Sequence, residues 1–317
     1  MSAELRFDGP VRRVVAITGA HHGLGREHAV LLGRRGARLV INDIQGAAET
    51  VAAVQEAGGE AIENTSDVTT AVGTDEIVRD ALDTWGRLDA IVNNAAGGAA
   101  VTLPDEAGTQ ATIAVHFLGT INLVRSALPV FRDQRYGRIV NTGSGSILGI
   151  PFTGTYAAGK GAVLAFSRVL ANELKAEPEL DIKVNVFMPA AQTPLMPRVP
   201  DERFQAMMDT AFAPARTSPL VAVLAHEDCP VSGEAIQTGA GRVARFVLAT
   251  TEGWQAPDDD PTPEAIVEHW SEVMATRDLR EPVGSMADLL SRRGEPPYSV
   301  ADLFVWARTG HPPDATG

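Results

Sequence analysis

The feature that most constrains this chain is a short apolar strand followed at once by three closely spaced glycines. Four apolar residues, 14–17, predict a strand that is covered on both faces. After the glycines an apolar helical pattern runs until Gly36. A strand, a glycine turn and a helix N-terminus together present bare backbone N–H groups to a pyrophosphate. We expect contacts with a dinucleotide from five residues of this turn: Gly19, His22, Gly23, Leu24 and Gly25.

The next predicted strand, 38–43, supports a dinucleotide site because it ends on an acid. Asp43 lies eighteen residues beyond Gly25, close to the spacing at which such folds place the carboxylate that holds the ribose 2′-hydroxyl. A carboxylate there repels a 2′-phosphate, so the sequence predicts NAD rather than NADP. His21 and His22 leave this open, since a protonated histidine beside the ribose could partly offset the repulsion.

Strands and helices alternate after Asp43 in a way that is typical of a doubly wound α/β fold. Further strands are expected over 61–65, 88–92, 138–142, 182–187 and 234–238. Helices are expected over 47–57, 77–85, 109–132, 156–175 and 220–225. This alternation predicts a parallel sheet with helices on both faces.

The alternation ends near residue 250. We predict a dinucleotide-binding domain over 1–250 and a helical C-terminal extension over 251–317 that has no core of its own. Helices are expected in the extension over 263–275, 285–292 and 300–308, with Thr262 and Ser299 as N-caps. Just before it, residues 195–212 are rich in methionine and phenylalanine, which favours either a mobile lid or an ordinary pair of surface helices.

Charge and cysteine content exclude some partners. A net charge of −13 argues against a nucleic-acid partner, since nothing would neutralise phosphates in bulk. Cys229 is the single cysteine, so no intrachain disulfide forms, which fits a reducing cytoplasm. No charged and apolar leader opens the chain, and no apolar run approaches the ~18 residues of a membrane span. We expect a soluble cytoplasmic protein without a membrane span.

A tyrosine and a lysine four residues apart are the strongest candidates for chemistry. Tyr156 and Lys160 share one face of a helix that begins directly after the fifth predicted strand. A free tyrosine, with a pKa of ~10, is a poor base near neutrality, and a nearby cation lowers that pKa. Ser144, at the end of the same strand, could hold a substrate oxygen beside the phenol. In a doubly wound sheet this is the end where ligands bind.

Together these residues resemble the short-chain dehydrogenase/reductase family over about residues 12–245. The motifs are Thr18-Gly19-x-x-x-Gly23-x-Gly25, Asp67-Val68, Asn93-Asn94-Ala95, Ser144 and Tyr156-x-x-x-Lys160. The resemblance implies a Rossmann-like fold, a nicotinamide cofactor and interconversion of an alcohol and a ketone. It implies that Tyr156 is the general acid/base, that Lys160 binds the nicotinamide ribose and lowers the pKa of Tyr156, and that Ser144 orients the substrate. The remaining cofactor contacts that it implies are Asp67, Val68, Asn94, Ala95 and Thr193.

Three positions depart from the family pattern. His116, twenty-eight residues before Ser144, stands where the family has an asparagine. We expect a site role for it in a water relay, and a packed structural histidine is the alternative. The family's serine, counted thirteen residues back from the tyrosine, would fall on Gly143; aligned from the strand it is Ser144, with Ser146 as a weaker candidate. The family's Pro-Gly after the sixth strand is here Pro189-Ala190.

A histidine in the asparagine's place resembles one branch of the family. That branch includes the 3-hydroxyacyl-CoA dehydrogenase unit of peroxisomal multifunctional enzymes and steroid-pathway dehydrogenases of actinobacteria. The strand end 40–43 and the segment 224–234, which runs into 238–241, resemble it too. His226, Glu227 and Cys229 lie in that segment, but one crowded cluster is a weak metal signal, and we expect no metal site.

The sequence thus predicts an NAD-dependent dehydrogenase that acts on a secondary alcohol of a bulky apolar small-molecule substrate. The substrate candidates are a 3-hydroxyacyl thioester and a hydroxysteroid, enclosed by the segment 195–225. The alternatives are a dinucleotide-binding sensor or scaffold without hydride transfer, and a small-molecule ketoreductase. The resemblance also implies a homodimer or homotetramer, formed through the helices over 109–132 and 156–175.

Overall fold

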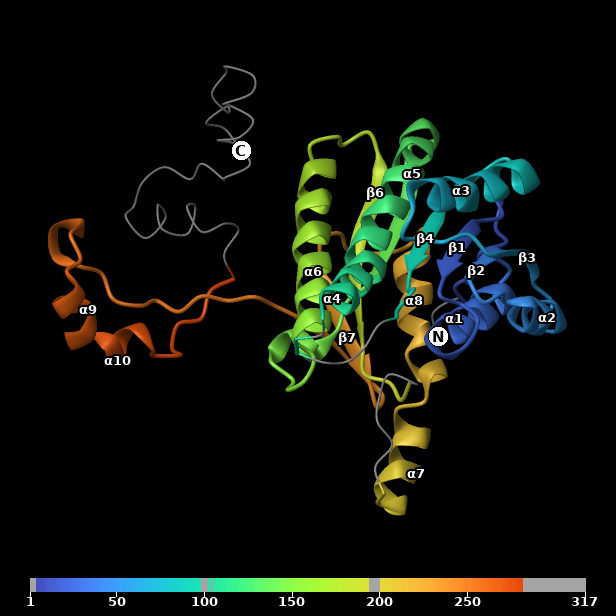
Figure 1. Ribbon diagram of the computed structural model, residues 1–317. Helices are drawn as coiled ribbons and strands as arrows, with labels where there is room; N and C mark the ends of the chain where they lie inside the picture. The colour runs from blue at the N-terminus through green and yellow to red at the C-terminus, as the bar shows by residue number, and fades with distance from the viewer. Residues whose placement is uncertain (1–3, 98–101, 104, 194–199, 282–317) are drawn as a thin grey trace. The chain divides into compact units, whose positions relative to one another are not determined.

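The computed structural model describes residues 4–97, 102–103, 105–193 and 200–281 (Figure 1). The chain divides into two compact units, Met1–Phe246 and Val247–Gly317, and each is described by itself. The first unit carries every predicted strand and every predicted site residue. The predicted assignment of the second unit as an extension without its own core stays a prediction.

The first unit is built on one sheet of eight strands, in the order β3-β2-β1-β4-β5-β6-β7-β8. Each pair of neighbours is parallel except β7 and β8, which are antiparallel. The predicted doubly wound sheet is therefore confirmed. The strands are β1 Val14–Thr18, β2 Arg38–Asn42, β3 Glu60–Asn64, β4 Ala90–Asn93, β5 Tyr136–Thr142, β6 Asp181–Pro189, β7 Ala235–Gly239 and β8 Arg242–Phe246.

Helices cover both faces of the sheet, because the central strands are apolar on both sides and every residue of β1 is buried. In the first unit they are α1 Gly23–Arg34, α2 Ala48–Glu56, α3 Ala71–Trp85, α4 Glu106–Ile113, the π-helical turn η1 Ala114–Leu118, α5 Gly119–Gln134, the 3₁₀ turn η2 Gly145–Leu148, α6 Gly154–Leu174, α7 Glu202–Ala211, the 3₁₀ turn η3 Pro214–Arg216 and α8 Ser218–Ala225.

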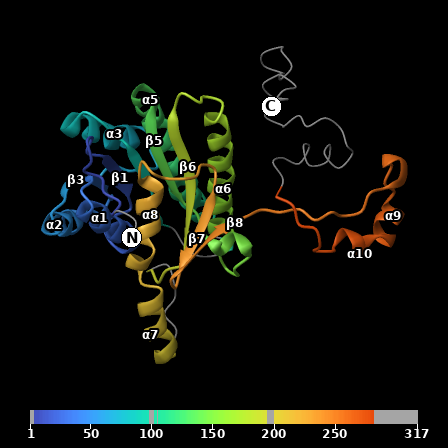
Figure 2. The same ribbon diagram turned by 180° about the vertical axis from the view of Figure 1, so that it is seen from behind.

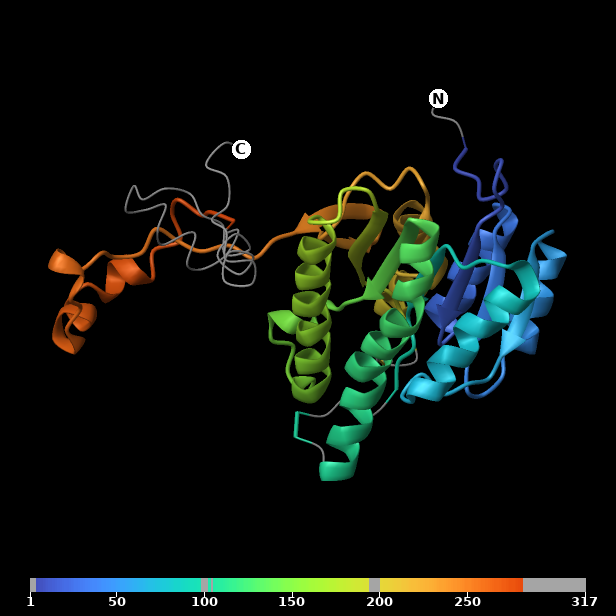
Figure 3. The same cartoon turned by 90° about the horizontal axis from the view of Figure 1, so that it is seen from above.

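Two apolar clusters, one on each face, make up most of the core. One joins α1 and α8 to the sheet through residues such as Leu32, Ile17 and Leu224. Figure 2 shows α8 lying across that face. The other joins α3, α5 and α6 to the opposite face through Ile77, Leu123 and Leu170 among others. Figure 3 shows these three helices, cyan to green, together on one side of the strands.

Buried asparagines line the carboxyl ends of the strands and fix the loops that leave them. The Asn42 amide donates to Asn64 Oδ1 at 2.7 Å, which joins the ends of β2 and β3. The Asn93 amide donates to Asn141 Oδ1 at 2.9 Å, which joins the ends of β4 and β5. Asn141 in turn donates to the Ser167 hydroxyl of α6 at 2.8 Å. Since each amide is buried and bonded, these ends are rigid platforms for side chains in the following loops.

The structure adds a strand that the sequence pattern did not predict. Strand β8 returns beside β7 through a tight turn in which Ala240 and Gly241 both have positive φ, 48° and 79°. Two consecutive positive φ values are typical of the two-residue turn that closes a β-hairpin. Alanine is an unusual residue for that conformation, so the local sequence gave only a weak hairpin signal.

The long helix predicted over 109–132 begins earlier and is interrupted by a π-helical turn. It runs as α4, η1 and α5 over Glu106–Gln134. In the described residues this run alone is long and apolar enough to cross a membrane, by length and composition only. The expectation that no run approaches that length is thus wrong, because no charged residue lies between Glu106 and Arg125. Leu123 and Phe131 of the run are buried in the core of the first unit, as in a helix that covers a sheet.

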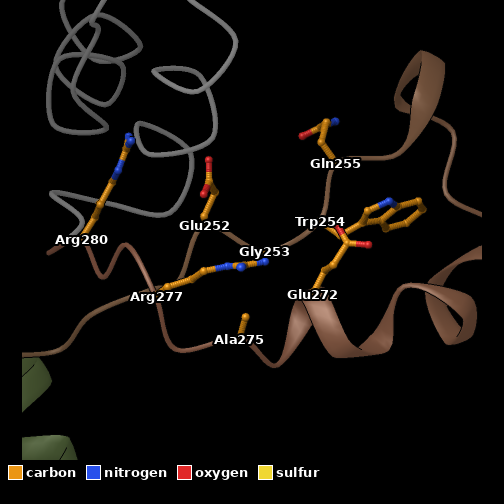
Figure 4. A pocket seen from close by; sticks show the side chains of 8 residues that line it. All are labelled: Glu252, Gly253, Trp254, Gln255, Glu272, Ala275, Arg277 and Arg280. Atoms are coloured by element: carbon orange, nitrogen blue, oxygen red, sulfur yellow. The ribbon is translucent and has the colours of Figure 1, made fainter.

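The described part of the second unit holds the short helices α9 Pro263–Glu268 and α10 Trp270–Val273, with a 3₁₀ turn η4 over Pro257–Asp259. Thr262 caps α9, since its hydroxyl accepts the N–H of Ala265, as predicted. The helices predicted over 285–292 and 300–308, and the Ser299 cap, lie outside the described residues. A polar hollow of about 600 Å³ is lined by Glu252, Gly253, Trp254, Gln255, Glu272, Ala275, Arg277 and Arg280 (Figure 4), none of them a predicted site residue.

Candidate active site

The order of the strands places the candidate site at the carboxyl ends of β1 and β4. The chain passes from β1 outward to β2 and β3 and then returns to β4 on the other side of β1. At such a reversal the loops after the two central strands diverge and leave a crevice, which is where doubly wound sheets bind ligands. The glycine turn follows β1, and Asn94 and Ala95 follow β4. The topology therefore brings the predicted dinucleotide contacts together.

The glycines are required by close backbone contacts in this crevice. Gly19 has a positive φ of 63°, and a Cβ there would lie 2.5 Å from the Cα of Ala95. A Cβ on Gly25 would overlap the Gly19 carbonyl oxygen and lie 2.7 Å from the Asn94 side-chain nitrogen. Helix α1 starts at Gly23, and its N-cap residue His22 makes no side-chain capping bond. A helix N-terminus with bare glycine backbone fits a pyrophosphate.

Thr18 ties the two loops together, a role that the sequence pattern did not reveal. Its hydroxyl accepts the backbone N–H of Asn94 at 3.1 Å and that of Ala95 at 3.0 Å. The Asn94 amide donates to the carbonyl oxygens of Thr18 and Gly19, both at 3.0 Å. Asn94 is buried, so these bonds fix the wall of the crevice rather than a mobile loop. The sequence feature that could have indicated this role is a threonine directly before the first glycine, at the end of a strand.

Asp43 stands at the carboxyl end of β2 with its carboxylate beside the glycine turn. It accepts the backbone N–H of His21 at 3.1 Å and that of Gln45 at 3.0 Å. The His21 ring donates from Nδ1 to the Gly46 carbonyl at 2.6 Å, and the His22 side chain is exposed. The structure thus brings Asp43 and the glycine turn together, as a ribose-binding carboxylate requires.

The other predicted cofactor contacts lie at neighbouring strand ends. After β3, Asp67 is exposed and accepts the N–H of Thr69 at 2.8 Å, while Val68 is buried. After β6, Thr193 is half-buried. The departure at Ala190 has a structural counterpart, because a Cβ on Gly239 would lie 2.7 Å from the Ala190 methyl. The methyl group of Ala190 therefore fills space that glycine at 239 leaves.

Tyr156, Ser144 and Lys160 converge at the start of α6. The Ser144 hydroxyl is near enough to the Tyr156 phenol to lower its pKa, and the Lys160 ammonium lies 5.9 Å from the centre of the tyrosine ring. Lys160 is buried and donates to the Thr142 carbonyl at 2.7 Å, which fixes it beneath the site. Burial lowers the pKa of Lys160 to about 8. These three side chains provide a hydroxyl donor, a proton-transfer group and a held cation.

The pKa of Tyr156 moves in the direction opposite to the one implied by the resemblance. Burial raises the pKa of Tyr156, and the nearby Ser144 hydroxyl opposes that rise. The ammonium of Lys160, which donates to the Thr142 carbonyl, does not contribute to this shift. Tyr156 is therefore protonated at neutral pH in this structure and is suited to donate a proton.

The structure distinguishes the three positions considered for the family's serine, which are 143, 144 and 146. A Cβ on Gly143 would lie 2.7 Å from a methyl group of Val186, so a side chain at 143 has no room toward β6. Ser144 is half-buried, its hydroxyl accepts the backbone N–H of Ser146 at 3.1 Å, and its presence lowers the pKa of Tyr156. The Ser146 hydroxyl is buried and makes no hydrogen bond in the described structure. Ser144 is therefore the residue that the structure brings to the site where the family's serine is expected.

The π-helical turn places His116 against the tyrosine. Its ring meets the Tyr156 ring edge-on, with centroids 4.8 Å apart, and its Nε2 bonds the Gly97 carbonyl at 2.8 Å. The Gly97 N–H also faces Nε2, but at 3.5 Å; because the carbonyl contact is much shorter and a carbonyl only accepts, we assign the proton to Nε2 and leave Nδ1 as the acceptor. Nδ1 is buried without a partner in the described residues. Burial and, to a lesser extent, the charge of Lys160 lower the pKa of His116 to about 3, against the opposing effect of the Gly97 bond.

Two buried neutral histidines make the fold sensitive to acid. His28 of α1 is fully buried, bonds the Ser218 hydroxyl of α8 at 2.8 Å, and has a pKa lowered by burial to about 3. In the unfolded chain both His28 and His116 regain a pKa of ~6.5. Between about pH 6.5 and pH 3 the unfolded chain therefore binds more protons than the folded chain. The contribution of these histidines to the free energy of unfolding is fully present above this window and is lost as pH falls through it.

We expect the free energy of unfolding to fall by about 1.4 kcal/mol per pH unit for each of these histidines below pH ~6. His28→Gln keeps a hydrogen-bonding side chain but no titration, so it should remove about half of that slope. Urea unfolding between pH 7 and pH 5 measures it. His22→Gln, which changes an exposed ring, is the matched control, and an equal slope in both variants would contradict the assignment.

The cluster that gave a weak metal signal makes structural contacts away from the site; its members are His226, Glu227 and Cys229. The His226 ring bonds the Arg6 carbonyl at 2.8 Å and accepts the N–H of Asp228 at 3.1 Å, so both nitrogens are used. Glu227 pairs with Arg13, and Cys229 is buried. Within the described residues no group of three His, Cys, Asp or Glu side chains is arranged to hold a metal.

Comparison with known proteins agrees with this geometry. A family model described as short chain dehydrogenase matches residues 13–203. The chain is 33% identical over 269 residues, 83% of its length, to the peroxisomal hydratase-dehydrogenase-epimerase of Neurospora crassa. It is 30% identical over 320 residues, 92% of its length, to the peroxisomal multifunctional enzyme type 2 of Mus musculus. The solved full-length peroxisomal multifunctional enzyme type 2 from Drosophila melanogaster superposes with a TM-score of 0.73 and 27% identity over 91% of this chain.

These relatives are much longer than the chain. It spans 29% of the Neurospora crassa protein, 41% of the Mus musculus protein and 49% of the solved Drosophila melanogaster chain. Similarity therefore extends to one part of each multifunctional protein.

Proposed function

Because the chain belongs to the short-chain dehydrogenase family, we propose that it interconverts a secondary alcohol and a ketone with NAD(H), using Tyr156 as general acid/base. The observation that carries this proposal is the convergence of Ser144, Tyr156, Lys160 and His116 beside the glycine crevice. A protein that only bound the dinucleotide would have no need of a phenol, a hydroxyl and a buried cation held together there.

The residues of the crevice fit a nicotinamide dinucleotide. Gly19, Gly23 and Gly25 leave the backbone open to the pyrophosphate, with Leu24 and His22 at the helix start. Asp43 would hold the adenosine ribose, and Lys160 the nicotinamide ribose. The remaining contacts would be Asp67, Val68, Asn94, Ala95 and Thr193. When bound, the nicotinamide accepts or supplies the hydride.

The side chains of the site supply the proton transfer. Ser144 donates a hydrogen bond that orients the substrate oxygen next to the phenol. In alcohol oxidation Tyr156 accepts the hydroxyl proton, and in ketone reduction it donates that proton to the carbonyl oxygen. Lys160 favours the phenolate as it forms, although burial keeps the resting phenol protonated. His116 Nδ1, a buried acceptor, would receive a hydrogen bond from a water in a relay to Lys160.

NAD is proposed over NADP because of the charge of Asp43. Its carboxylate sits at the end of β2, where it accepts two backbone N–H groups. The neighbouring His21 ring is held by the Gly46 carbonyl. A 2′-phosphate on the adenosine ribose would meet the carboxylate at short range, and like charges repel.

A 3-hydroxyacyl thioester is the proposed substrate class. Two relatives carry the words hydratase-dehydrogenase-epimerase or multifunctional enzyme in their names, and hydration of an enoyl thioester gives a 3-hydroxyacyl thioester. A hydroxysteroid is the second candidate. Helix α7, with Phe204 and Met207 exposed and no buried residue, would cover such a substrate. Met196 of the same apolar segment lies outside the described residues.

The test is NADH formation by the purified protein with 3-hydroxyacyl-CoA and hydroxysteroid alcohols in parallel, each with NAD and with NADP. We expect turnover of the thioester, and kcat/KM at least tenfold higher with NAD. NADH binding without turnover of any alcohol or ketone would contradict catalysis and favour a sensor. Turnover with NADP at an equal rate would contradict the role of Asp43.

Compartment and assembly stay predictions. The single buried Cys229 fits a reducing compartment, and the word peroxisomal belongs to the names of the relatives. A cytoplasmic location is kept as the prediction. A homodimer or homotetramer formed through α5 and α6 also stays our prediction.

A further inference from the structure

The loop after β3, residues 67–70, lies where the adenine of the proposed cofactor would be held. The pyrophosphate is assigned to the glycine turn after β1 and the adenosine ribose to Asp43 after β2, and β3 is the next strand outward. The adenine would continue from the ribose in that direction. Asp67 is exposed and Val68 is buried in this segment, which we call the β3 loop.

One side chain of another element bonds the backbone of the β3 loop. The Asn122 amide of α5 donates to the carbonyl oxygen of Val68 at 3.3 Å and to that of Thr69 at 3.1 Å. No other side chain in the described part of the chain donates to either carbonyl. Asn122 is half-buried and lies more than fifty residues from the loop. The orientation of two consecutive peptide groups therefore depends on this one amide.

Two neighbours of Asn122 on α5 bring its amide within reach of the loop. Gly119 lies one helical turn earlier, and a Cβ there would lie 3.0 Å from a methyl group of Val68. Glycine at 119 therefore lets α5 approach the loop more closely than a larger residue would. Leu123, the residue after Asn122, is buried in the same apolar cluster as Val68. Packing thus sets the distance between α5 and the loop, and the amide sets the orientation of the carbonyls.

The other hydrogen bonds of the β3 loop are local. The Asp67 carboxylate accepts the N–H of Thr69 at 2.8 Å, and the Asp67 carbonyl accepts the N–H of Thr70 at 3.1 Å. Thr70 then caps α3, because its hydroxyl accepts the N–H of Gly73 at 3.0 Å. Helix α5 packs beside α3, which the loop leads into (Figure 1). A loop with local bonds alone opens easily, so Asn122 supplies its attachment to the rest of the fold.

We propose that Asn122 is a positioning residue for the cofactor, which holds the β3 loop in the shape that receives the adenine and thereby sets the affinity for NAD(H). This inference rests on the proposed function, since it assumes a nicotinamide dinucleotide in the crevice. The Asn122 amide bonds the loop alone, so it acts through the loop and not on the reacting atoms. A loop that is already ordered loses less conformational entropy when its ligand binds.

The reacting end of the site is held by separate contacts, although one helical run carries both ends. His116 of η1 lies six residues before Asn122. Its ring is fixed by the bond to the Gly97 carbonyl and by the edge-on contact with Tyr156. Loss of the Asn122 amide breaks neither contact. The effect of that loss should therefore appear in the affinity for the cofactor and not in kcat.

The test compares the dissociation constants of NADH, ADP-ribose and reduced nicotinamide mononucleotide by isothermal titration calorimetry. Asn122→Leu removes the amide with little change in volume, and Asn122→Asp keeps its shape but presents a carboxylate that cannot donate. In both variants we expect Kd to rise about tenfold for NADH and for ADP-ribose, which carry the adenine. Kd for reduced nicotinamide mononucleotide, which lacks adenine, should stay within about twofold, as should kcat at saturating NAD.

Gln134→Met is the matched control, because it removes an amide from the same helix. Gln134 ends α5, and its amide bonds the backbone of Leu88, which precedes β4 at the amino end of the sheet. This variant should leave the Kd of all three probes unchanged. An equal effect in Gln134→Met, or an equal rise for reduced nicotinamide mononucleotide, would mean that Asn122 supports the fold in general and would overturn the proposal. Unchanged NADH affinity in either Asn122 variant would overturn it too.

The outcomes separate this inference from the proposed function. If the wild-type protein binds none of the three probes, the proposed function is wrong and the positioning role falls with it. If the wild-type protein binds NADH and turns over an alcohol while the Asn122 variants bind NADH equally well, the positioning role is wrong and the proposed function stands.

Discussion

Tyr156→Phe is expected to reduce turnover about a thousandfold while NADH binding stays within a fewfold of wild type. The substitution removes one oxygen and keeps the ring that meets His116 edge-on. Without the phenol no group in the described site lies between Ser144 and Lys160 to move the substrate proton. Steady-state turnover and NADH fluorescence titration measure the two quantities.

Tyr136→Phe is the matched control for the loss of a phenol oxygen. Tyr136 begins β5 at the amino end of the sheet, opposite the site, and its buried hydroxyl makes no hydrogen bond in the described structure. Its ring stacks under the guanidinium groups of Arg13 and Arg138, which phenylalanine would preserve. Turnover should be unchanged in this variant. Turnover retained in Tyr156→Phe would show that another group transfers the proton.

Arg138→Met is expected to lower the free energy of unfolding by about 3–5 kcal/mol. Arg138 lies in β5 with its side chain completely buried. It donates to the carbonyl oxygens of Gly137, Asp181, His226 and Glu227 at 2.7–3.0 Å and to the Asp181 carboxylate at 2.8 Å. Methionine would fill similar space but leave these buried carbonyls without donors. Urea unfolding at neutral pH measures the loss.

Arg132→Met is the matched control for this prediction. Arg132 of α5 is about half exposed and pairs with Glu177 at 2.7 Å. Exposed ion pairs contribute little, so we expect a loss below about 1 kcal/mol. Equal losses in the two variants would mean that the buried hydrogen bonds of Arg138 do not carry the stability assigned to them.

The proximity of the candidate site residues could be predicted where chemistry and local spacing coincide. Gly19, Gly25 and Asp43 follow from a strand, a turn and an acid at a fixed distance, and the structure brings them together. Tyr156 and Lys160 share a helical face because they are four residues apart. Thr18 was missed as a hub because its bonds to Asn94 and Ala95 join loops more than seventy residues apart.

The direction of the Tyr156 pKa shift needed the tertiary structure. The sequence places a lysine one helical turn away and so predicts a lowered pKa. In the fold, burial raises it, and the carbonyl of Thr142 holds the ammonium of Lys160. Burial and the partners of a cation are set by elements distant in the chain, so spacing alone could not give the sign.

Periodicity, glycine positions and the tyrosine–lysine spacing by themselves determined the parallel sheet, the dinucleotide crevice and the family. These signals are local, since each arises from backbone geometry within one element or one turn. Only the tertiary structure decided that a π-helical turn sets His116 against the phenol, that Thr18 joins the loops after β1 and β4, and that β8 extends the sheet beside β7. Each of these depends on contacts between segments far apart in the chain, whose packing overrides local preference.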